Sequence, residues 1–338
     1  MVALGKASNA FLTWAASQGI ETPLNLAERD DGRYVFCSED IKAGQDLLSC
    51  PVSACIVADS LEGHTFVCWS ERRLNTLLSK IELEGVAERL AYERQLGEKS
   101  KYAPYMDVLP TLDDDRLLSL PRFWDSKRLD LVTDGGQLLR RMKNDERKDI
   151  DQWALACVDS RANFLGDGTY AMTPLLDMIN HDGSVQTRAR IEKNKGFSGP
   201  GNVLHLSLGK DYSKGEEAFI SYGNLANLDT LADYGFVTEN NPCNSESIEV
   251  RMMQELEVFS TLEEGQGLGL LAKPISDRNE LDVTSFIAST IAEASGEARA
   301  GANDTNDDRL IQKYLSERAT LLDLALQRIL AKYPGLEY

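Results

Sequence analysis

The chain has 338 residues, of which 42% are hydrophobic and 27% are charged, and its 36 basic and 54 acidic side chains give a net charge of −18. This size and composition are typical of a globular protein with one large domain or two ordinary ones. The excess of carboxylates argues against a nucleic-acid partner, because neutralising phosphates requires clustered Lys and Arg. No apolar run reaches the roughly 18 residues that a membrane span requires, so no membrane partner is expected. The charge suits a basic protein substrate, and it equally suits a surface that only keeps the protein in solution.

Cysteine and histidine are sparse and scattered, which limits the chemistry available. The six cysteines form no C-x-x-C pair and no close cluster with the three histidines, so no metal site is predicted. We expect free, mostly buried thiols in a reducing compartment. Because no apolar signal segment stands near the N-terminus, an intracellular location is expected, in the cytoplasm, the nucleus or an organelle.

The first part of the chain alternates between one helix and several short strands. Apolar spacing predicts an amphipathic helix over 8–19, stopped by a glycine. Short β-prone pieces follow at 34–37, 46–50 and 54–57, separated by turn residues. These pieces are too few to bury a core alone.

The middle of the chain changes to helical spacing and then returns to strands. Apolar residues recur at helical intervals within 70–160, with further helices predicted at 126–143 and 145–159, so a helical insertion over about 60–160 is expected. Strands and turns return over 170–237, and the uniformly apolar residues 218–220 predict a buried strand. We therefore expect the two strand-rich parts to associate across a helical insertion.

The end of the chain is predicted to be helical. The spacing of apolar residues predicts helices over 255–261, 281–294 and 308–332. Residues 296–307, rich in Gly, Ala, Asn and Asp, predict a loop between the last two helices.

Two motifs about forty residues apart carry the functional signal. Residues 176–181 read LDMINH and residues 220–223 read ISYG, and a third piece at 233–237 reads DYGFV. Together they resemble the catalytic core of SET-domain protein methyltransferases, in the branch that includes Rubisco large-subunit methyltransferase. The resemblance implies an α+β fold, with a strand-rich SET core of small knotted sheets over 1–240 that a helical insertion interrupts. An all-helical substrate-binding domain over 241–338 follows. It also implies S-adenosyl-L-methionine as cofactor and a protein as substrate.

The chemistry of such a transfer needs orientation more than a catalytic triad. Donor and acceptor must be held in line, and the amine must be neutral, which burial in an apolar channel favours. A tyrosine hydroxyl and backbone carbonyls can orient that amine. Tyr222 follows an apolar strand and precedes Gly223, where the chain can turn sharply. Its residue pattern alone indicates a core tyrosine at a strand end, and the resemblance makes Tyr222 the catalytic tyrosine and a member of the cofactor site.

The resemblance also assigns the loop that precedes this strand. Asn180 and His181 are implied to bind the cofactor, largely through backbone groups, and Asp177 is implied to brace their loop. Tyr234 and Phe236 are implied to line the substrate channel, whereas by themselves they indicate packing aromatics. Residues of the Asp and Asn type are common in ordinary turns, so the spacing from Tyr222 is what gives the motif its weight.

Arg161 lies in a stretch, 160–164, that resembles a Ser-Arg-x-Phe element of this branch with one extra residue. The resemblance implies that Arg161 contacts the cofactor's carboxylate, a role that suits a planar bidentate donor. The alternative is a surface ion pair with Asp159 or Asp167.

A glycine-containing turn near the N-terminus completes the implied cofactor site. Asp31, Gly32 and Arg33 align with the family's acidic-Gly-x-Gly loop, whose backbone approaches the cofactor. Tyr34 stands where the family has the second glycine. Its ring would either crowd the cleft or stack elsewhere.

The leading interpretation is therefore an S-adenosylmethionine-dependent protein-lysine N-methyltransferase. Methylation of a histidine is a close variant, since the same branch includes such activity. A second class is a non-catalytic SET-like protein-binding module, and a third is a helical adaptor with the SET core as scaffold. The shape of the acceptor pocket and the affinity for the cofactor separate these interpretations.

Overall fold

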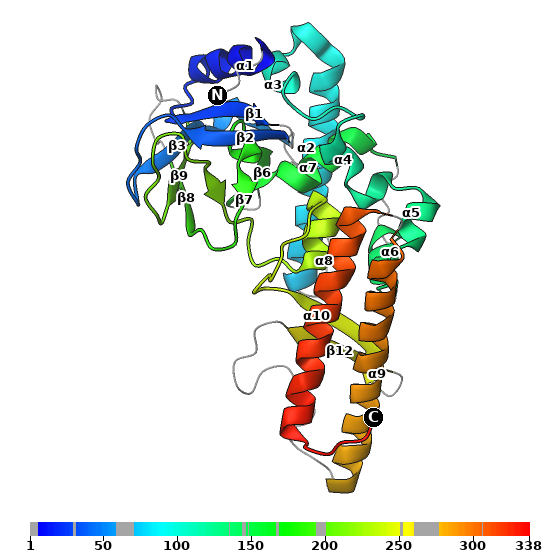
Figure 1. Cartoon of the computed structure of the whole chain (residues 1–338). Coiled ribbons are helices and arrows are strands. Elements are labelled where there is room, and N and C mark those ends of the chain that lie inside the picture. The colour runs from blue at the N-terminus through cyan, green and yellow to red at the C-terminus, as the bar shows by residue number, and fades with distance from the viewer. Residues whose placement is uncertain are drawn as a thin grey trace. The chain divides into compact units, whose positions relative to one another are not determined.

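The computed structural model, whose helices and strands are labelled in Figure 1, describes residues 6–29, 32–58, 71–134, 136–143, 147, 149–166, 169–193, 201–250, 253–259, 277–305 and 307–338. The chain forms two compact units, each with its own core. Unit 1 comprises Met1–Leu112 and Arg147–Gly223, and unit 2 comprises Asp113–Glu146 and Asn224–Tyr338. Part of the predicted insertion thus belongs to the same unit as the C-terminal helices. The predicted domain boundary at residue 240 stays a prediction.

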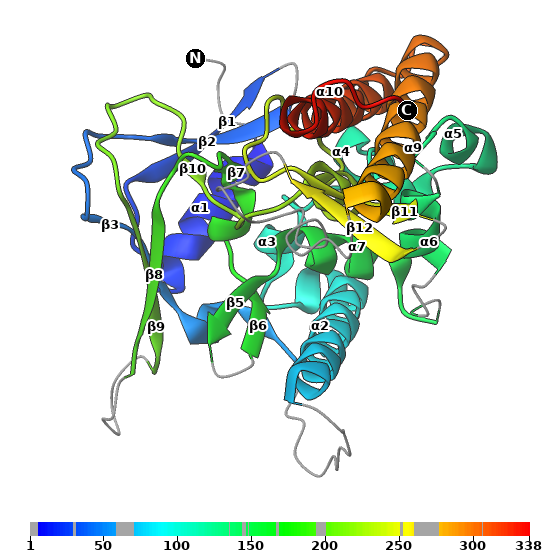
Figure 2. The same ribbon diagram turned by 90° about the horizontal axis from the view of Figure 1, so that it is seen from below.

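Unit 1 contains several small sheets (Figure 2). One is an antiparallel hairpin, and two have three strands each, ordered β3-β9-β8 and β4-β6-β5. Their strands are β1 (Leu24–Arg29) and β2 (Gly32–Cys37), then β3 (Asp46–Pro51), β9 (Val203–Leu208) and β8 (Thr187–Glu192), then β4 (Ile56–Val57), β6 (Thr169–Met172) and β5 (Asn163–Gly166). Strands before residue 60 pair with strands after residue 160, so the predicted association across the insertion is confirmed. The predicted strands at 34–37 and 46–50 are confirmed as well.

A short crossing segment joins the hairpin to the candidate site. The Ala218 N–H donates to the carbonyl of Val35 in β2, and β10 (Phe219–Ile220) then pairs with β7 (Asn180–His181). This last pairing is parallel, with Phe219 opposite Asn180. The predicted buried strand at 218–220 is therefore confirmed, and its end lies beside the Asn-His motif.

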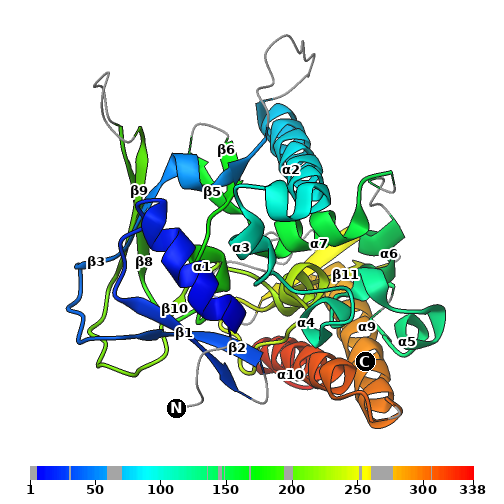
Figure 3. The ribbon, with the colours of Figure 1, turned by 90° about the horizontal axis from the view of Figure 1, so that it is seen from above.

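Helix α1 (Lys6–Ser17) confirms the helix predicted over 8–19 and buries the side chain of Phe11. The helix is followed by Gly19, whose φ of 81° suits a glycine and strains other residues. α1 packs beside α3 (Ala103–Met106) through stacked aromatic rings (Figure 3).

The part of the insertion in unit 1 is helical, as predicted. The long helix α2 (Glu71–Leu96) contacts α7 (Gln152–Arg161). Helix α7 begins later than the predicted 145–159, because the Asp151 carboxylate accepts a hydrogen bond from the Ala154 N–H and caps it there. Its last turn carries Arg161.

Unit 2 is mainly helical, as the resemblance implies, and its longest elements are α9 and α10. The helix predicted over 126–143 is divided in two, with Gly136 at a φ of 76° between the halves. The helices described in unit 2 are α4 (Asp115–Leu118), α5 (Ser126–Asp130), α6 (Gln137–Lys143), α8 (Asn227–Asp229), α9 (Asp277–Asn303) and α10 (Arg309–Lys332), together with the 3₁₀-helix η3 (Pro121–Phe123) and the π-helix η5 (Thr230–Tyr234).

Two predictions for the C-terminal region are wrong. The helix predicted over 255–261 is instead the strand β12 (Met253–Phe259), which pairs with β11 (Ser245–Val250). Polar and apolar residues alternate only over 247–250 of β11, and because β11 and β12 form a hairpin the region is not all-helical. The loop predicted over 296–307 is mostly helix, because α9 continues to Asn303.

The continuation of α9 has a steric basis in its small residues. Ala298 and Ala302 are buried on this last part of the helix. A Cβ atom at Gly301 would lie 2.0 Å from the Thr133 Oγ1, so only glycine permits the approach of that loop. Gly and Ala thus mark a close contact here, where the sequence pattern indicates a loop.

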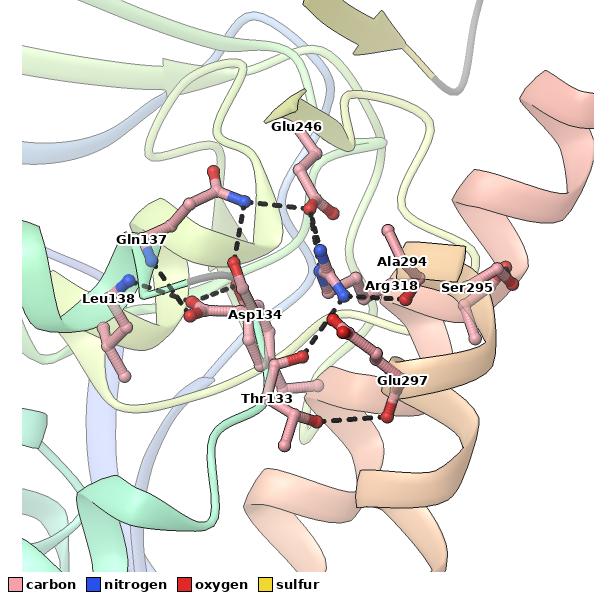
Figure 4. Close-up of polar contacts among 11 residues, drawn as sticks. Thr133, Asp134, Gln137, Leu138, Glu246, Ala294, Ser295, Glu297 and Arg318 are labelled. Atoms are coloured by element: carbon pink, nitrogen blue, oxygen red, sulfur yellow. Dashed lines mark hydrogen bonds and ion pairs between the residues drawn. The ribbon is translucent and has the colours of Figure 1, made fainter. Parts of the chain in front are cut away.

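A buried ion pair links four segments of unit 2 (Figure 4). Arg318 of α10 donates from Nε to Glu246 Oε1 over 2.7 Å, and the two side chains are 4% and 7% exposed. Arg318 also donates to the carbonyls of Thr133 and Ala294, and Gln137 donates to Glu246. The pair therefore connects β11, both long helices and the loop before α6.

Candidate active site

Tyr222 and His181 lie in contact at the end of the β7–β10 pair. The Tyr222 backbone N–H donates to His181 Nδ1 over 3.0 Å, and the two ring centroids are 5.0 Å apart. Burial lowers the pKa of His181, which favours the neutral ring that this contact requires. The Tyr222 hydroxyl donates to the carbonyl of Ile179 over 2.8 Å. Tyr222 is thus held at its backbone and at its hydroxyl by the same short segment, 179–181.

Asp177 lies two residues before Ile179 and its side chain is fully buried. Its Oδ2 accepts a hydrogen bond of 2.9 Å from the Tyr105 hydroxyl, and Arg161 Nη1 donates over 2.8 Å to its carbonyl. Burial raises the pKa of Asp177 to about 6, against the attraction of Arg161 and the more distant Arg33. Asp177 is the centre of a buried charged cluster, which supports the bracing role predicted for it.

The residue before this turn, Leu175, has a rare backbone conformation. Its φ is 74° and its ψ is −41°, although it is a fully buried leucine. Such a conformation costs free energy for any residue with a Cβ atom and persists only where the surroundings impose it. It directly precedes the turn η4 (Leu176–Met178), which carries Asp177.

Arg161 turns inward, and among the described residues its ion-pair partner is Asp177 and not Asp159. Asp159 pairs instead with Arg147, over 2.8 Å, and Asp167 lies outside the described residues. Only 16% of the Arg161 side chain is exposed, and its buried Nε has no hydrogen-bond acceptor among the described residues. This buried N–H lies beside the Asp177 loop and can donate to the carboxylate of a bound ligand.

Strand β2 explains where the unexpected Tyr34 lies. Val35 and Cys37 are buried on one face of β2, and Arg33 shares that face and donates to the Val108 carbonyl over 2.6 Å. Tyr34 points to the opposite face, where its ring lies 6.0 Å from that of Phe36. Of the two outcomes predicted for Tyr34, the structure has the ring packing away from the Arg33 face.

The other residues predicted for the site fall in different places. Gly32 is the first residue of β2, whereas Asp31 lies outside the described residues. Asn180 is exposed, and its Nδ2 donates to Glu217 Oε1 over 2.9 Å. Glu217 was not predicted, and nothing in its local sequence indicates this contact.

Tyr234 and Phe236 belong to unit 2. Tyr234 is the last residue of η5, and the two rings are 6.1 Å apart, on either side of a glycine at a φ of 74°. Arg141 forms ion pairs with Asp229 and Asp233, which fix this turn. The channel role of Tyr234 and Phe236 stays a prediction.

Three further features concern metal ions, membranes and cysteines. In the part of the chain that the structure describes, no group of three or more His, Cys, Asp or Glu residues is arranged to hold a metal ion. Across these same residues, no helix combines the length and apolarity needed to cross a membrane. The five described cysteines are free, and four of them are buried, as predicted.

Three curated relatives show partial similarity. Protein SET DOMAIN GROUP 40 of Arabidopsis thaliana is 22% identical over 289 residues, covering 68% of this chain and 58% of that protein. Actin-histidine N-methyltransferase of Danio rerio is 26% identical, covering 68% and 42%. A chloroplastic fructose-bisphosphate aldolase-lysine N-methyltransferase of Arabidopsis thaliana is 23% identical, covering 72% and 54%. The chain thus spans about half the length of the curated relatives it matches.

Among solved structures, the SET domain of Rubisco LSMT bound to methyllysine and AdoHcy has a TM-score of 0.67 at 19% identity, covering 99% of this chain and 95% of that one. This likeness shows the fold, and the predicted α+β architecture is confirmed in its helices and small sheets. The model of the SET domain matches residues 32–223. Because this match covers more than half of the residues of the chain, the chain belongs to the SET-domain family.

Proposed function

We propose that this protein is an S-adenosyl-L-methionine-dependent protein-lysine N-methyltransferase. The observation that carries the proposal is the Tyr222 hydroxyl, 2.8 Å from the Ile179 carbonyl and beside the Asn180–His181 segment. A hydroxyl and a carbonyl in one place are the groups that can orient an amine. Membership of the SET-domain family and a relative named as a lysine N-methyltransferase support it.

The residues of the buried cluster fit the cofactor. Arg161 has a buried N–H donor for its carboxylate, and the backbones of Gly32, Asn180 and His181 are the further candidates to hold it. When bound, S-adenosyl-L-methionine supplies a sulfonium methyl group. The Asp177 carboxylate favours the charged form of the Arg161 guanidinium, and the Asp177 carbonyl accepts a hydrogen bond that holds this guanidinium in place.

The residues of the chain contribute orientation to the proposed reaction. The Tyr222 hydroxyl donates to the Ile179 carbonyl, so its oxygen remains an acceptor that can orient the amine. An apolar channel favours the neutral form of a lysine, which has the lone pair required for attack. Tyr234 and Phe236 are proposed to line that channel.

We also propose a basic region on the protein substrate and a reducing compartment. The net charge of −18 supports the first, since opposite charge accelerates encounter. Free, buried thiols support the second, in the cytoplasm, the nucleus or an organelle. Residues 241–338 are proposed to contact the substrate.

Transfer of a labelled methyl group into a lysate tests the function. The labelled protein is identified by mass spectrometry, and acid hydrolysis is expected to release methyllysine. Release of methylhistidine instead would favour the variant that the name of the actin-histidine relative suggests. Failure to bind S-adenosylhomocysteine in calorimetry would leave the non-catalytic binding module as the interpretation.

A further inference from the structure

Tyr105 links the helical insertion to the buried charged cluster. It lies in α3, it is fully buried, and its hydroxyl donates to Asp177 Oδ2 over 2.9 Å. The two residues are 72 positions apart, so this contact exists only because α3 packs onto the SET core.

The ring of Tyr105 is held in place by α1. Its centroid lies 5.9 Å from that of Phe11 and 6.2 Å from that of Trp14, and the Trp14 plane is within 6° of parallel. The Trp14 Nε1 donates to the carbonyl of Lys101, which fixes the indole in turn. The stacked rings restrict the orientation of the Tyr105 ring and so hold its hydroxyl within hydrogen-bond distance of the Asp177 carboxylate.

The surroundings of Asp177 contain few other partners. Arg161 Nη1 is 3.9 Å from Oδ2, and Asp177 Oδ1 is buried with no hydrogen-bond partner among the described residues. The Tyr105 hydroxyl is therefore the one described side-chain donor within hydrogen-bond distance of this carboxylate. The remaining titratable or charged groups that face it from the packed elements are Arg33 of β2, Cys50 of β3 and Cys157 of α7.

We propose that Tyr105 is a positioning residue of the candidate cofactor site, which keeps the Asp177 carboxylate ionised and in place behind Arg161. Burial raises the pKa of Tyr105 well above its ordinary value, so the hydroxyl keeps its proton and remains a donor. Its hydrogen bond lowers the pKa of Asp177, which burial alone would raise further. The inference rests on the proposed function only for the identity of the ligand.

A pH profile distinguishes this role from ordinary packing. Because the folded pKa of Asp177 is raised to about 6, its contribution to stability is present at low pH and is lost as the pH rises through that value. Tyr105→Phe removes one hydrogen bond to a charged group, which should move this titration upward by about one pH unit. The cost of Tyr105→Phe in unfolding free energy should therefore grow as the pH rises from about 5 to about 8.

Tyr102→Phe is the matched control. Tyr102 is also buried and lies in the same segment, but its hydroxyl donates over 2.8 Å to the neutral carbonyl of Cys55. Its cost should not change with pH. In an Asp177→Asn background, Tyr105→Phe should lose its pH dependence as well.

The experiment measures two profiles on the full chain, denaturant unfolding and the calorimetric affinity for S-adenosylhomocysteine. Tyr105→Phe is expected to move the midpoint of both profiles upward, and Tyr102→Phe to move neither. Coincident profiles for the two variants would overturn the proposal, as would a shift in unfolding without a shift in binding. If no variant and no wild-type protein binds S-adenosylhomocysteine, the proposed function fails, and the unfolding profiles alone decide whether Tyr105 controls Asp177.

Discussion

Leu175 has a strained backbone directly before the turn that carries Asp177. Its φ of 74° is accessible to glycine without strain and costs other residues about 1 kcal/mol or more. The Leu175→Ala and Leu175→Gly variants both remove the buried side chain, with a cost of about 2–5 kcal/mol. Glycine also relieves the strain, so Leu175→Gly should be the more stable of the two by about 1 kcal/mol. Denaturant unfolding of both variants checks this reversal of the usual order, and a more stable alanine variant would contradict it.

Tyr222 allows a test of chemistry apart from binding. Tyr222→Phe keeps the backbone N–H that donates to His181 and removes only the hydroxyl. Methyl transfer should fall by about 100-fold or more, because an oriented polar group beside the acceptor is lost, while the affinity for S-adenosylhomocysteine changes little. Single-turnover assays and calorimetry measure the two quantities.

Tyr212 provides the control for this change. It is buried, and its hydroxyl lies 3.4 Å from the carbonyl of Phe219, on the strand that leads to Tyr222. Tyr212→Phe should leave methyl transfer unchanged. Undiminished transfer in Tyr222→Phe would exclude it as the catalytic tyrosine.

Among the elements, α10 shows how a buried charge can organise a helical unit. Arg318→Met leaves Glu246 buried without its counter-charge, which should cost about 3–5 kcal/mol of unfolding free energy. The matched control is Arg299→Met, which breaks the ion pair of Arg299 with Asp323 between α9 and α10. That pair is 55% and 32% exposed, so its loss should cost less than about 1 kcal/mol. Equal costs for the two variants, measured by denaturant unfolding, would contradict the organising role of Arg318.

The elements also show where sequence patterns are informative. The apolar 218–220 strand is a local signal, and it is found in the structure, whereas the start of α7 at the Asp151 cap differs from the helix predicted over 145–159. The contact between Tyr222 and His181 depends on the parallel pairing of two strands of two residues each, which no periodicity predicts. Only the resemblance of the two motifs to the family places these residues in one site. Tyr105 could not be found in this way, because its hydrogen bond crosses 72 residues and its neighbours read as an ordinary turn.

At the scale of the whole molecule, charge is distributed unevenly along the chain. Unit 2 has 28 acidic and 16 basic residues, whereas unit 1 has 26 and 20. If the substrate is basic, kcat/KM for the protein substrate should fall about tenfold between about 50 mM and about 500 mM salt, because screening removes the steering. The affinity for S-adenosylhomocysteine, a small ligand without net charge, should change little. A kcat/KM that does not depend on salt would mean that the acidic surface serves solubility alone.

The stack of Trp14 on Tyr105 has a practical consequence for anyone who trims this protein. The SET-domain match begins at residue 32, after α1 has ended. A fragment cut at the edges of that match would keep Gly32, Arg161, His181 and Tyr222, and with them the LDMINH and ISYG motifs. It would lack the aromatic wall behind Tyr105, and with it the fixed position of the hydroxyl on Asp177. The smallest fragment that keeps the Tyr105–Asp177 contact in place should therefore be longer than the part that the SET-domain model matches.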